Sequence, residues 1–212
     1  MGNFKIETYV VGIVRTKCYI VINEETNECI VIDPGASGGA LTDKIRTGGY
    51  QPVAVFLTHG HFDHVAAART VAEEFQIPIY AYEAERETLE HPQKNASVMI
   101  GAGESYNADV FVTDGQVLDL AGFSVTVIHT PGHTEGGCCY YFAEEEILFS
   151  GDTLFAQSVG RTDLPGGSMS TLVRSVREKL LVLSTSAKDI TVYPGHNDPT
   201  TIETERKYNP YL

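Results

Sequence analysis

The amino-acid sequence predicts an α+β fold in which two β-sheets pack face to face and helices cover their outer surfaces. Two β-rich halves follow each other along the chain, and each half includes segments whose apolar residues recur at helical spacing. Because a sheet with one apolar face must bury that face, two such halves are expected to pack sheet against sheet. The 212 residues contain no low-complexity segment or linker, so we expect a single domain over residues 1–212. Residues 197–212 are expected to form a short C-terminal tail, with no separate substrate-binding domain.

The first half is dominated by short runs of β-branched and aromatic residues, which are typical of strands. Strands are predicted at residues 6–14, 18–22, 29–32, 53–57 and 77–80. A helix is predicted at residues 40–47, where a pair of glycines stops it. A second helix is predicted from Asp63, because apolar residues recur at helical spacing from there to Phe75. Residues 82–105 are expected to be helical or irregular.

The second half repeats this plan. Strands are predicted at residues 110–112, 117–120, 123–128, 137–142, 147–149 and 190–193. A helix is predicted at residues 169–183, because Leu172, Val176 and Leu180 fall on one face of it.

The charge balance bears on the partners of the protein. The net charge is −13 and the isoelectric point is near 4.9. Binding of nucleic acid requires clustered Lys and Arg, so we expect no nucleic-acid partner. A small anionic substrate is still compatible with this surface if the site itself is locally positive.

The chain also lacks the signals of membrane insertion and secretion. No apolar run approaches the roughly 18 residues needed to span a bilayer. The N-terminal segment has no basic region followed by a long apolar stretch, so no signal peptide is expected. We therefore expect a cytoplasmic monomer or homodimer with no membrane partner. The four cysteines are expected to be buried thiols, and they are Cys18, Cys29, Cys138 and Cys139.

The most informative feature is a cluster of His59, His61, Asp63 and His64. Such crowding of imidazoles and a carboxylate has no packing rationale. His59 and His61 point the same way in an extended turn, so both can reach one ion. Asp63 and His64 lie at a predicted helix start, where a carboxylate faces the positive end of the helix.

Three further candidates follow apolar runs later in the chain. His133, Asp152 and His196 each come directly after a glycine, which lets the backbone turn sharply and approach an ion. All candidates thus fall on loops at strand ends, where a site on a rigid scaffold is expected. Together they give seven nitrogen or oxygen ligands, enough for two divalent ions. A mixture of His and Asp suits zinc, which we expect first, and also iron or manganese.

These residues resemble the metallo-β-lactamase-fold hydrolases. The matching motifs lie at residues 59–64, 130–134, 150–155 and 194–196. Within that superfamily the chain is similar to the short, single-domain glyoxalase II-like (hydroxyacylglutathione hydrolase-like) proteins, as residues 158–168 and 209–212 indicate. The resemblance implies a four-layer αββα sandwich with the metals at one edge.

The resemblance also implies roles for the candidate ligands. His59, His61 and His133 would hold the first metal, Asp63, His64 and His196 the second, and Asp152 would bridge them. The implied reaction is hydrolysis of a thioester, S-D-lactoylglutathione, to D-lactate and glutathione. A hydroxide that bridges the metals would attack the carbonyl, and Asp63 and Asp152 would be the catalytic residues.

Two departures from that family concern the substrate. Full-length glyoxalase II proteins carry a C-terminal helical domain with basic residues that bind glutathione, and this chain is too short for it. Arg161 is the best candidate to take over part of that role, because its loop follows the predicted bridging ligand. Asp198 also places an acid close after the last ligand, His196.

The main alternative is a persulfide dioxygenase-like oxidoreductase on the same fold. Such an enzyme holds one iron by two His and one Asp, and this arrangement leaves positions open for oxygen. The chain retains a full set of ligands for a second metal, which disfavours this alternative. These ligands are Asp63, His64 and His196. A metallo-hydrolase of another small ester, thioester or lactone is a further alternative. A purely structural metal site is the weakest reading, since structural sites usually saturate the ion with protein ligands.

Overall fold

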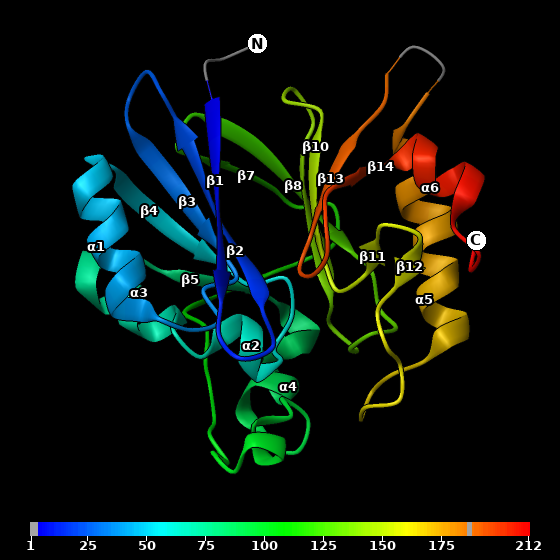
Figure 1. The fold of residues 1–212 in the computed structure, drawn as a ribbon, viewed down its shortest axis with the longest axis horizontal. Coiled ribbons are helices and arrows are strands. Elements are labelled where there is room, and N and C mark those ends of the chain that lie inside the picture. Colours follow the sequence, from blue (N-terminus) through cyan, green and yellow to red (C-terminus); the bar gives the residue numbers. More distant parts are fainter. Residues whose placement is uncertain (1–3, 186–187) are drawn as a thin grey trace.

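The computed structural model describes residues 4–185 and 188–212, which contain two six-stranded sheets (Figure 1). The first has the order β1-β2-β3-β4-β5-β6, with β1 Phe4–Val11, β2 Thr16–Asn23, β3 Glu28–Ile32, β4 Gln51–Phe56, β5 Ile79–Tyr82 and β6 Val110–Val112. The second has the order β14-β13-β10-β9-β8-β7, with β7 Val117–Leu120, β8 Phe123–His129, β9 Cys138–Phe142, β10 Ile147–Gly151, β13 Thr191–Pro194 and β14 Thr200–Thr201. The expectation of no signal peptide rests partly on residues 1–3, which lie outside the described residues.

Helices cover the outer face of each sheet. In Figure 1, α1 (Gly38–Gly48) and α3 (Ala68–Phe75) lie outside the first sheet, and α5 (Met169–Ser175) and α6 (Ile202–Tyr208) lie outside the second. Buried apolar side chains fill the space beneath each helical layer. The predicted αββα order of layers is therefore confirmed. Within the described ranges, every helix is too short or too polar to traverse a lipid bilayer.

The core between the sheets also fixes the edge at which the candidate ligands lie. The rings of Phe56 and Tyr140 stack with their centroids 4.5 Å apart. Tyr140 donates its hydroxyl hydrogen bond to the carbonyl oxygen of Leu57, at 2.9 Å, just beyond the end of β4. Tyr19 likewise donates to the carbonyl oxygen of Pro194, at 2.6 Å, at the end of β13. The packed aromatic core thus ties strand ends of one sheet to side chains of the other.

Parallel pairing brings the carboxyl ends of key strands to this edge. β3 and β4 run parallel in the first sheet, and β10 and β13 run parallel in the second. Because the carboxyl ends of parallel strands meet at the same edge, the loops that follow them converge. These loops carry the histidines after β4, Asp152 after β10 and His196 after β13.

Several element boundaries differ from the prediction. β1 ends at Val11 instead of residue 14, because Gly12 adopts a left-handed φ of 67° and begins the turn to β2. The helix predicted from Asp63 is two helices, since α2 (Phe62–Val65) ends before α3 begins at Ala68.

The C-terminal part shows further differences. The helix predicted at 169–183 is α5 followed by a π-helical turn, η3 (Val176–Leu180), and a 3-10 turn, η4 (Leu181–Leu183). The predicted tail contains β14 and α6, and Ile202 of α6 is completely buried. This tail therefore completes the second helical layer.

Candidate metal centre

The loop after β4 and the short helix α2 carry the histidine cluster. His59 and His61 lie in the loop, and both side chains are buried. Asp63 and His64 lie in α2. The chain before α1 packs closely against this segment because residue 35 is glycine. A β-carbon on Gly35 would lie 1.4 Å from the carbonyl oxygen of Asp63.

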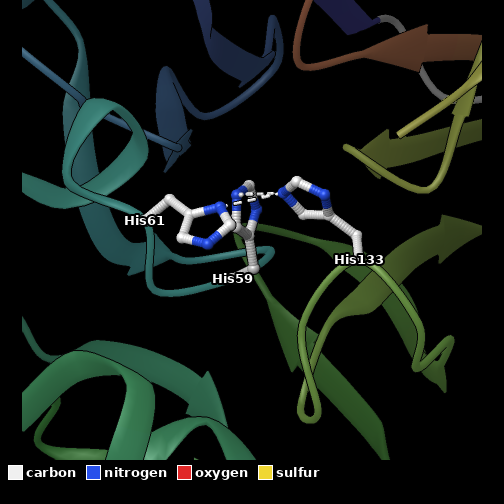
Figure 2. Close-up of side chains that lie close together, drawn as sticks. All are labelled: His59, His61 and His133. Carbon is white, nitrogen blue, oxygen red and sulfur yellow. Dashed lines mark hydrogen bonds between the residues drawn. The ribbon is translucent and has the colours of Figure 1, made fainter. Parts of the chain in front are cut away.

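His59, His61 and His133 form the first group of candidate ligands (Figure 2). His133 comes from the loop after β8 and reaches the other two from the second sheet. Its Nε2 lies 2.9 Å from Nδ1 of His61 and 3.3 Å from Nε2 of His59. Three imidazole nitrogens thus face one another, an arrangement that can surround one ion.

Asp63, His64 and His196 form the second group. Nε2 of His64 and Nε2 of His196 lie 3.4 Å and 3.3 Å from Oδ2 of Asp63. Asp152 lies between the two groups. Its Oδ1 is 3.4 Å from Nε2 of His64, and its Oδ2 is 3.6 Å from Nε2 of both His133 and His196. All seven predicted ligands therefore lie together.

The donor set fits divalent ions. Two ligand atoms bound at about 2.1 Å in tetrahedral geometry lie about 3.4 Å apart, close to most of these separations. Among the described residues, Nε2 of His64 and Oδ1 of Asp152 are buried without a hydrogen-bond partner, and they lie 3.4 Å apart in this site. Because an unpartnered buried polar atom is costly, such a concentration favours a ligand held by the site.

Burial sets the protonation of the first group. It lowers the pKa of His59 and His61 well below the ordinary value, and neighbouring imidazoles add to this effect. Burial also lowers the pKa of His133. The three imidazoles are thus neutral near pH 7, and a neutral imidazole is the form that binds a metal ion.

Charges within the second group favour ionised forms. Burial alone would raise the pKa of Asp63, but His64, His196 and the Thr16 hydroxyl outweigh it and hold the pKa of this carboxyl well below its usual range. Burial likewise opposes charge on His64, but Asp63 and the other nearby carboxylates raise its pKa to about 10. A metal ion at this group must therefore displace a proton from His64.

Sequence reasoning missed Asp33, a buried carboxylate at the end of β3. Its Oδ2 lies 2.8 Å from Nδ1 of His64, which donates to it and so directs Nε2 into the site. Thr58 donates to both oxygens of Asp33, from its backbone N–H at 2.8 Å and from its hydroxyl at 2.6 Å. The only sequence signal was its place in a turn directly after a strand.

Two other contacts orient candidate ligands. Thr16, at the start of β2, donates its hydroxyl hydrogen bond to Oδ2 of Asp63 at 2.6 Å. His133 donates from Nδ1 to the carbonyl oxygen of Arg161 at 2.7 Å, which leaves its Nε2 free for the site. A threonine in a strand carries no sequence signal of such a role.

Glu85 was also missed, and it lies behind the first group. Its side chain is 1% exposed. Oε1 accepts a hydrogen bond from the backbone N–H of Gly60 at 2.8 Å. Oε2 accepts from the backbone N–H of Gly136 at 2.8 Å and from the Thr134 hydroxyl at 3.0 Å. Gly60 separates His59 from His61, and Thr134 follows the third ligand, so Glu85 connects the two loops that carry the first group.

The site opens into a cavity of about 580 Å³. Much of its wall is apolar, and the apolar lining includes Val14, Met99, Ile100, Phe155 and Leu164. Such a volume suits a small organic substrate.

Arg161, the predicted substrate-binding residue, also lines this cavity. However, its Nε and one terminal nitrogen each donate to an oxygen of Asp163 at 2.7 Å. This bidentate pair engages the guanidinium, and both side chains are more than half exposed to solvent.

The fold and these ligands define a class of protein. Residues 11–196 match the family described as the Metallo-beta-lactamase superfamily. The chain therefore belongs to this superfamily, as predicted.

Curated relatives match over almost their whole length. The chain is 35% identical to a probable metallo-hydrolase, YqgX, of Bacillus subtilis, with 95% of this chain and 94% of that protein covered. It is 34% identical to the hydroxyacylglutathione hydrolase GloC of Haemophilus influenzae, with 98% and 97% covered.

Solved structures agree with this assignment. The B3 metallo-beta-lactamase BLEG-1 superposes with a TM-score of 0.91 at 37% identity, covering 98% of this chain and 99% of that one. A di-iron-bound form of TTHA1623 gives 0.85 at 33% identity, covering 97% and 100%. ETHE1 from Myxococcus xanthus gives 0.79 at 25% identity, covering 97% and 83%.

Proposed function

We propose that the protein is a binuclear metal-dependent hydrolase that cleaves a small thioester. The observation that carries this proposal is the pair of ligand groups that share Asp152 and open into one cavity of about 580 Å³. S-D-lactoylglutathione is the first candidate substrate, supported by the similarity to GloC over nearly the full chain.

The reaction adds water to the thioester carbonyl carbon, breaks the carbon–sulfur bond and yields a carboxylic acid and a thiol. Divalent ions held by the two groups supply the usual metal-ion chemistry, namely a lowered pKa of water and polarisation of the carbonyl. Asp63 is ionised and fixed by Thr16, so it would orient the attacking water. His64 is fixed by Asp33, and His133 by the carbonyl of Arg161, so both keep Nε2 toward the reacting atoms.

A covalent route through cysteine is disfavoured. Cys138 and Cys139 lie in β9 and are buried. Burial raises the pKa of Cys139 to about 11 and that of Cys138 well above its ordinary value. A thiolate nucleophile would thus be scarce at neutral pH.

A persulfide dioxygenase-like oxidoreductase is the second candidate, favoured by the similarity to ETHE1. One iron with two His and one Asp would suffice for that chemistry. The complete second group of Asp63, His64 and His196 has no role in that reading and favours the hydrolase.

To test this proposal, the protein is reconstituted with zinc, iron or manganese and assayed with a set of substrates. The substrates are S-D-lactoylglutathione, simpler thioesters, a lactone and glutathione persulfide. Thiol release from the thioesters, acid release from the lactone and oxygen uptake are recorded on the same samples. Thiol release without oxygen uptake supports the hydrolase. Oxygen uptake with persulfide, and no release from any thioester, would move the protein to the oxidoreductase class.

A further inference from the structure

A second cavity, of about 450 Å³, adjoins the candidate metal centre beside the turn between β1 and β2. It shares Val14, His196 and Asn197 with the larger cavity, so the two meet at a candidate metal ligand. Val10, Arg15, Lys17 and Asp198 also line it. We propose that this cavity is an anion-binding subsite, which we call the Arg15–Lys17 subsite. It would hold a carboxylate or phosphate of the thiol half of the substrate, and this inference rests on the proposed function.

Lys17 is held in position by its own strand. Its backbone N–H donates to the carbonyl oxygen of Gly195 at 2.8 Å, which ties the start of β2 to the residue before His196. Only 14% of its side chain is exposed, and its Nζ lies 3.6 Å from Oδ1 of Asp198. The Asp198 side chain is 96% exposed, so water screens this pair and the ammonium keeps much of its attraction for a second anion.

Arg15 is the second basic residue of the Arg15–Lys17 subsite. It lies in the turn with a left-handed φ of 64°, and its side chain is exposed. In the described part of the chain, the ion pairs of this region are Lys17 with Asp198 and Arg161 with Asp163, and Arg15 makes none.

The position of Arg15 and Lys17 beside the candidate metal centre matters because the protein as a whole is acidic. The chain carries a net charge of −13, so an anionic substrate is repelled by most of the surface. Asp163 engages two nitrogens of Arg161 at 2.7 Å, a tighter pairing than the single 3.6 Å contact of Lys17 with Asp198, and the larger cavity otherwise offers apolar walls. The acyl half suits those walls, and an anionic group is attracted past His196 toward Arg15. A guanidinium also binds carboxylate and phosphate by paired hydrogen bonds.

The chemistry that fits is thus a thioester whose thiol bears a carboxylate or a phosphate. A glutathione thioester carries carboxylates, and a 4′-phosphopantetheine thioester carries a phosphate. An N-acetylcysteamine thioester of the same acyl group is neutral and serves as the reference. Comparing the glutathione and phosphopantetheine thioesters shows which anion the subsite prefers. Comparing either with the N-acetylcysteamine thioester shows whether an anion is needed.

The experiment measures kcat and KM of metal-replete protein for the three thioesters. Arg15→Gln should raise KM for the preferred anionic thioester about tenfold, the value of a lost charged hydrogen bond, and leave the neutral one unchanged. Asp198→Asn should lower KM for that ester about twofold to fivefold, because it frees Lys17. Arg161→Gln is the matched control and should leave the charge preference unchanged. Since Asp198→Asn predicts a gain, damage to folding cannot imitate the pattern.

Two readouts separate failure of this inference from failure of the proposed function. Hydrolysis of all three thioesters with equal KM, unaffected by Arg15→Gln and Asp198→Asn, would overturn the subsite and keep the thioesterase. If no thioester is hydrolysed, amide NMR of the metal-loaded protein is titrated with glutathione and with 4′-phosphopantetheine. Saturable shifts at Arg15 and Lys17, lost in Arg15→Gln, would support the subsite alone, and their absence would overturn it too.

Discussion

Glu85→Gln perturbs the support of the first ligand group without changing the size of the side chain. The carboxyl accepts from Gly60 on one oxygen and from Gly136 and Thr134 on the other. A glutamine must place its NH₂ against Gly60 or against Gly136, and either choice leaves a buried backbone N–H without an acceptor. One such group costs about 1–3 kcal/mol. We expect the free energy of unfolding to fall by about 2 kcal/mol.

The same change should weaken metal binding, because Gly60 lies between His59 and His61. Loss of an interaction that orients metal ligands typically lowers affinity about 10–100-fold. The assay is competition with a chromophoric chelator, followed by elemental analysis and by denaturant unfolding of the metal-free protein. We expect the loss to fall on the ion held by His59, His61 and His133.

Glu205→Gln is the matched control. Glu205 is also completely buried, and it accepts hydrogen bonds from Thr200, Gln157 and Asn209, away from the ligand loops. It should lower stability by a similar amount and leave metal affinity unchanged. Equal metal affinity in both variants and the natural protein would refute the positioning role of Glu85.

Three further outcomes follow from the same contacts. Asp33→Asn should lower the affinity of the ion at His64 about 10–100-fold, so that elemental analysis after dialysis finds close to one ion per chain. Gly35→Ala should lower the free energy of unfolding by about 1–3 kcal/mol, because its β-carbon meets the Asp63 carbonyl, and an unchanged denaturant midpoint would contradict this. Burial raises the pKa of Glu85 from 4.5 to about 7. The free energy of unfolding should thus fall as the pH rises from 4.5 through 7. Glu85→Gln has no proton to lose, so its loss of stability should be largest below pH 4.5 and shrink as the pH rises through 7.

The sequence predicted the parts of the molecule that follow from local pattern. Runs of β-branched residues predicted most strands, and the crowded histidines at 59–64 predicted the candidate ligands. The break between α2 and α3 was not predictable, because apolar spacing continues through Val65 and Ala68 while the backbone turns. The tail was underestimated because α6 gains its stability from packing of Ile202 against the second sheet, which is a long-range contact.

The roles of Glu85 and Asp33 could not be predicted from the sequence, because they also depend on long-range contacts. Glu85 and Asp33 acquire their roles from backbone N–H groups and side chains 25 to 51 positions away. In the sequence, each is an ordinary acidic residue in a turn or polar segment. Arg161 lines the larger cavity, as a substrate-binding residue would, but the sequence did not indicate that its neighbour Asp163 pairs with it, and its role stays a prediction.

The most direct test of the central claim is the dependence of thioester hydrolysis on the number of ions bound. Metal-free protein is titrated with zinc or iron while thiol release from S-D-lactoylglutathione and bound metal are measured in each sample. The account predicts that turnover rises steeply as binding passes one ion and levels off near two ions per chain. Full turnover at one ion per chain, or oxygen uptake without thiol release, would contradict a binuclear hydrolase.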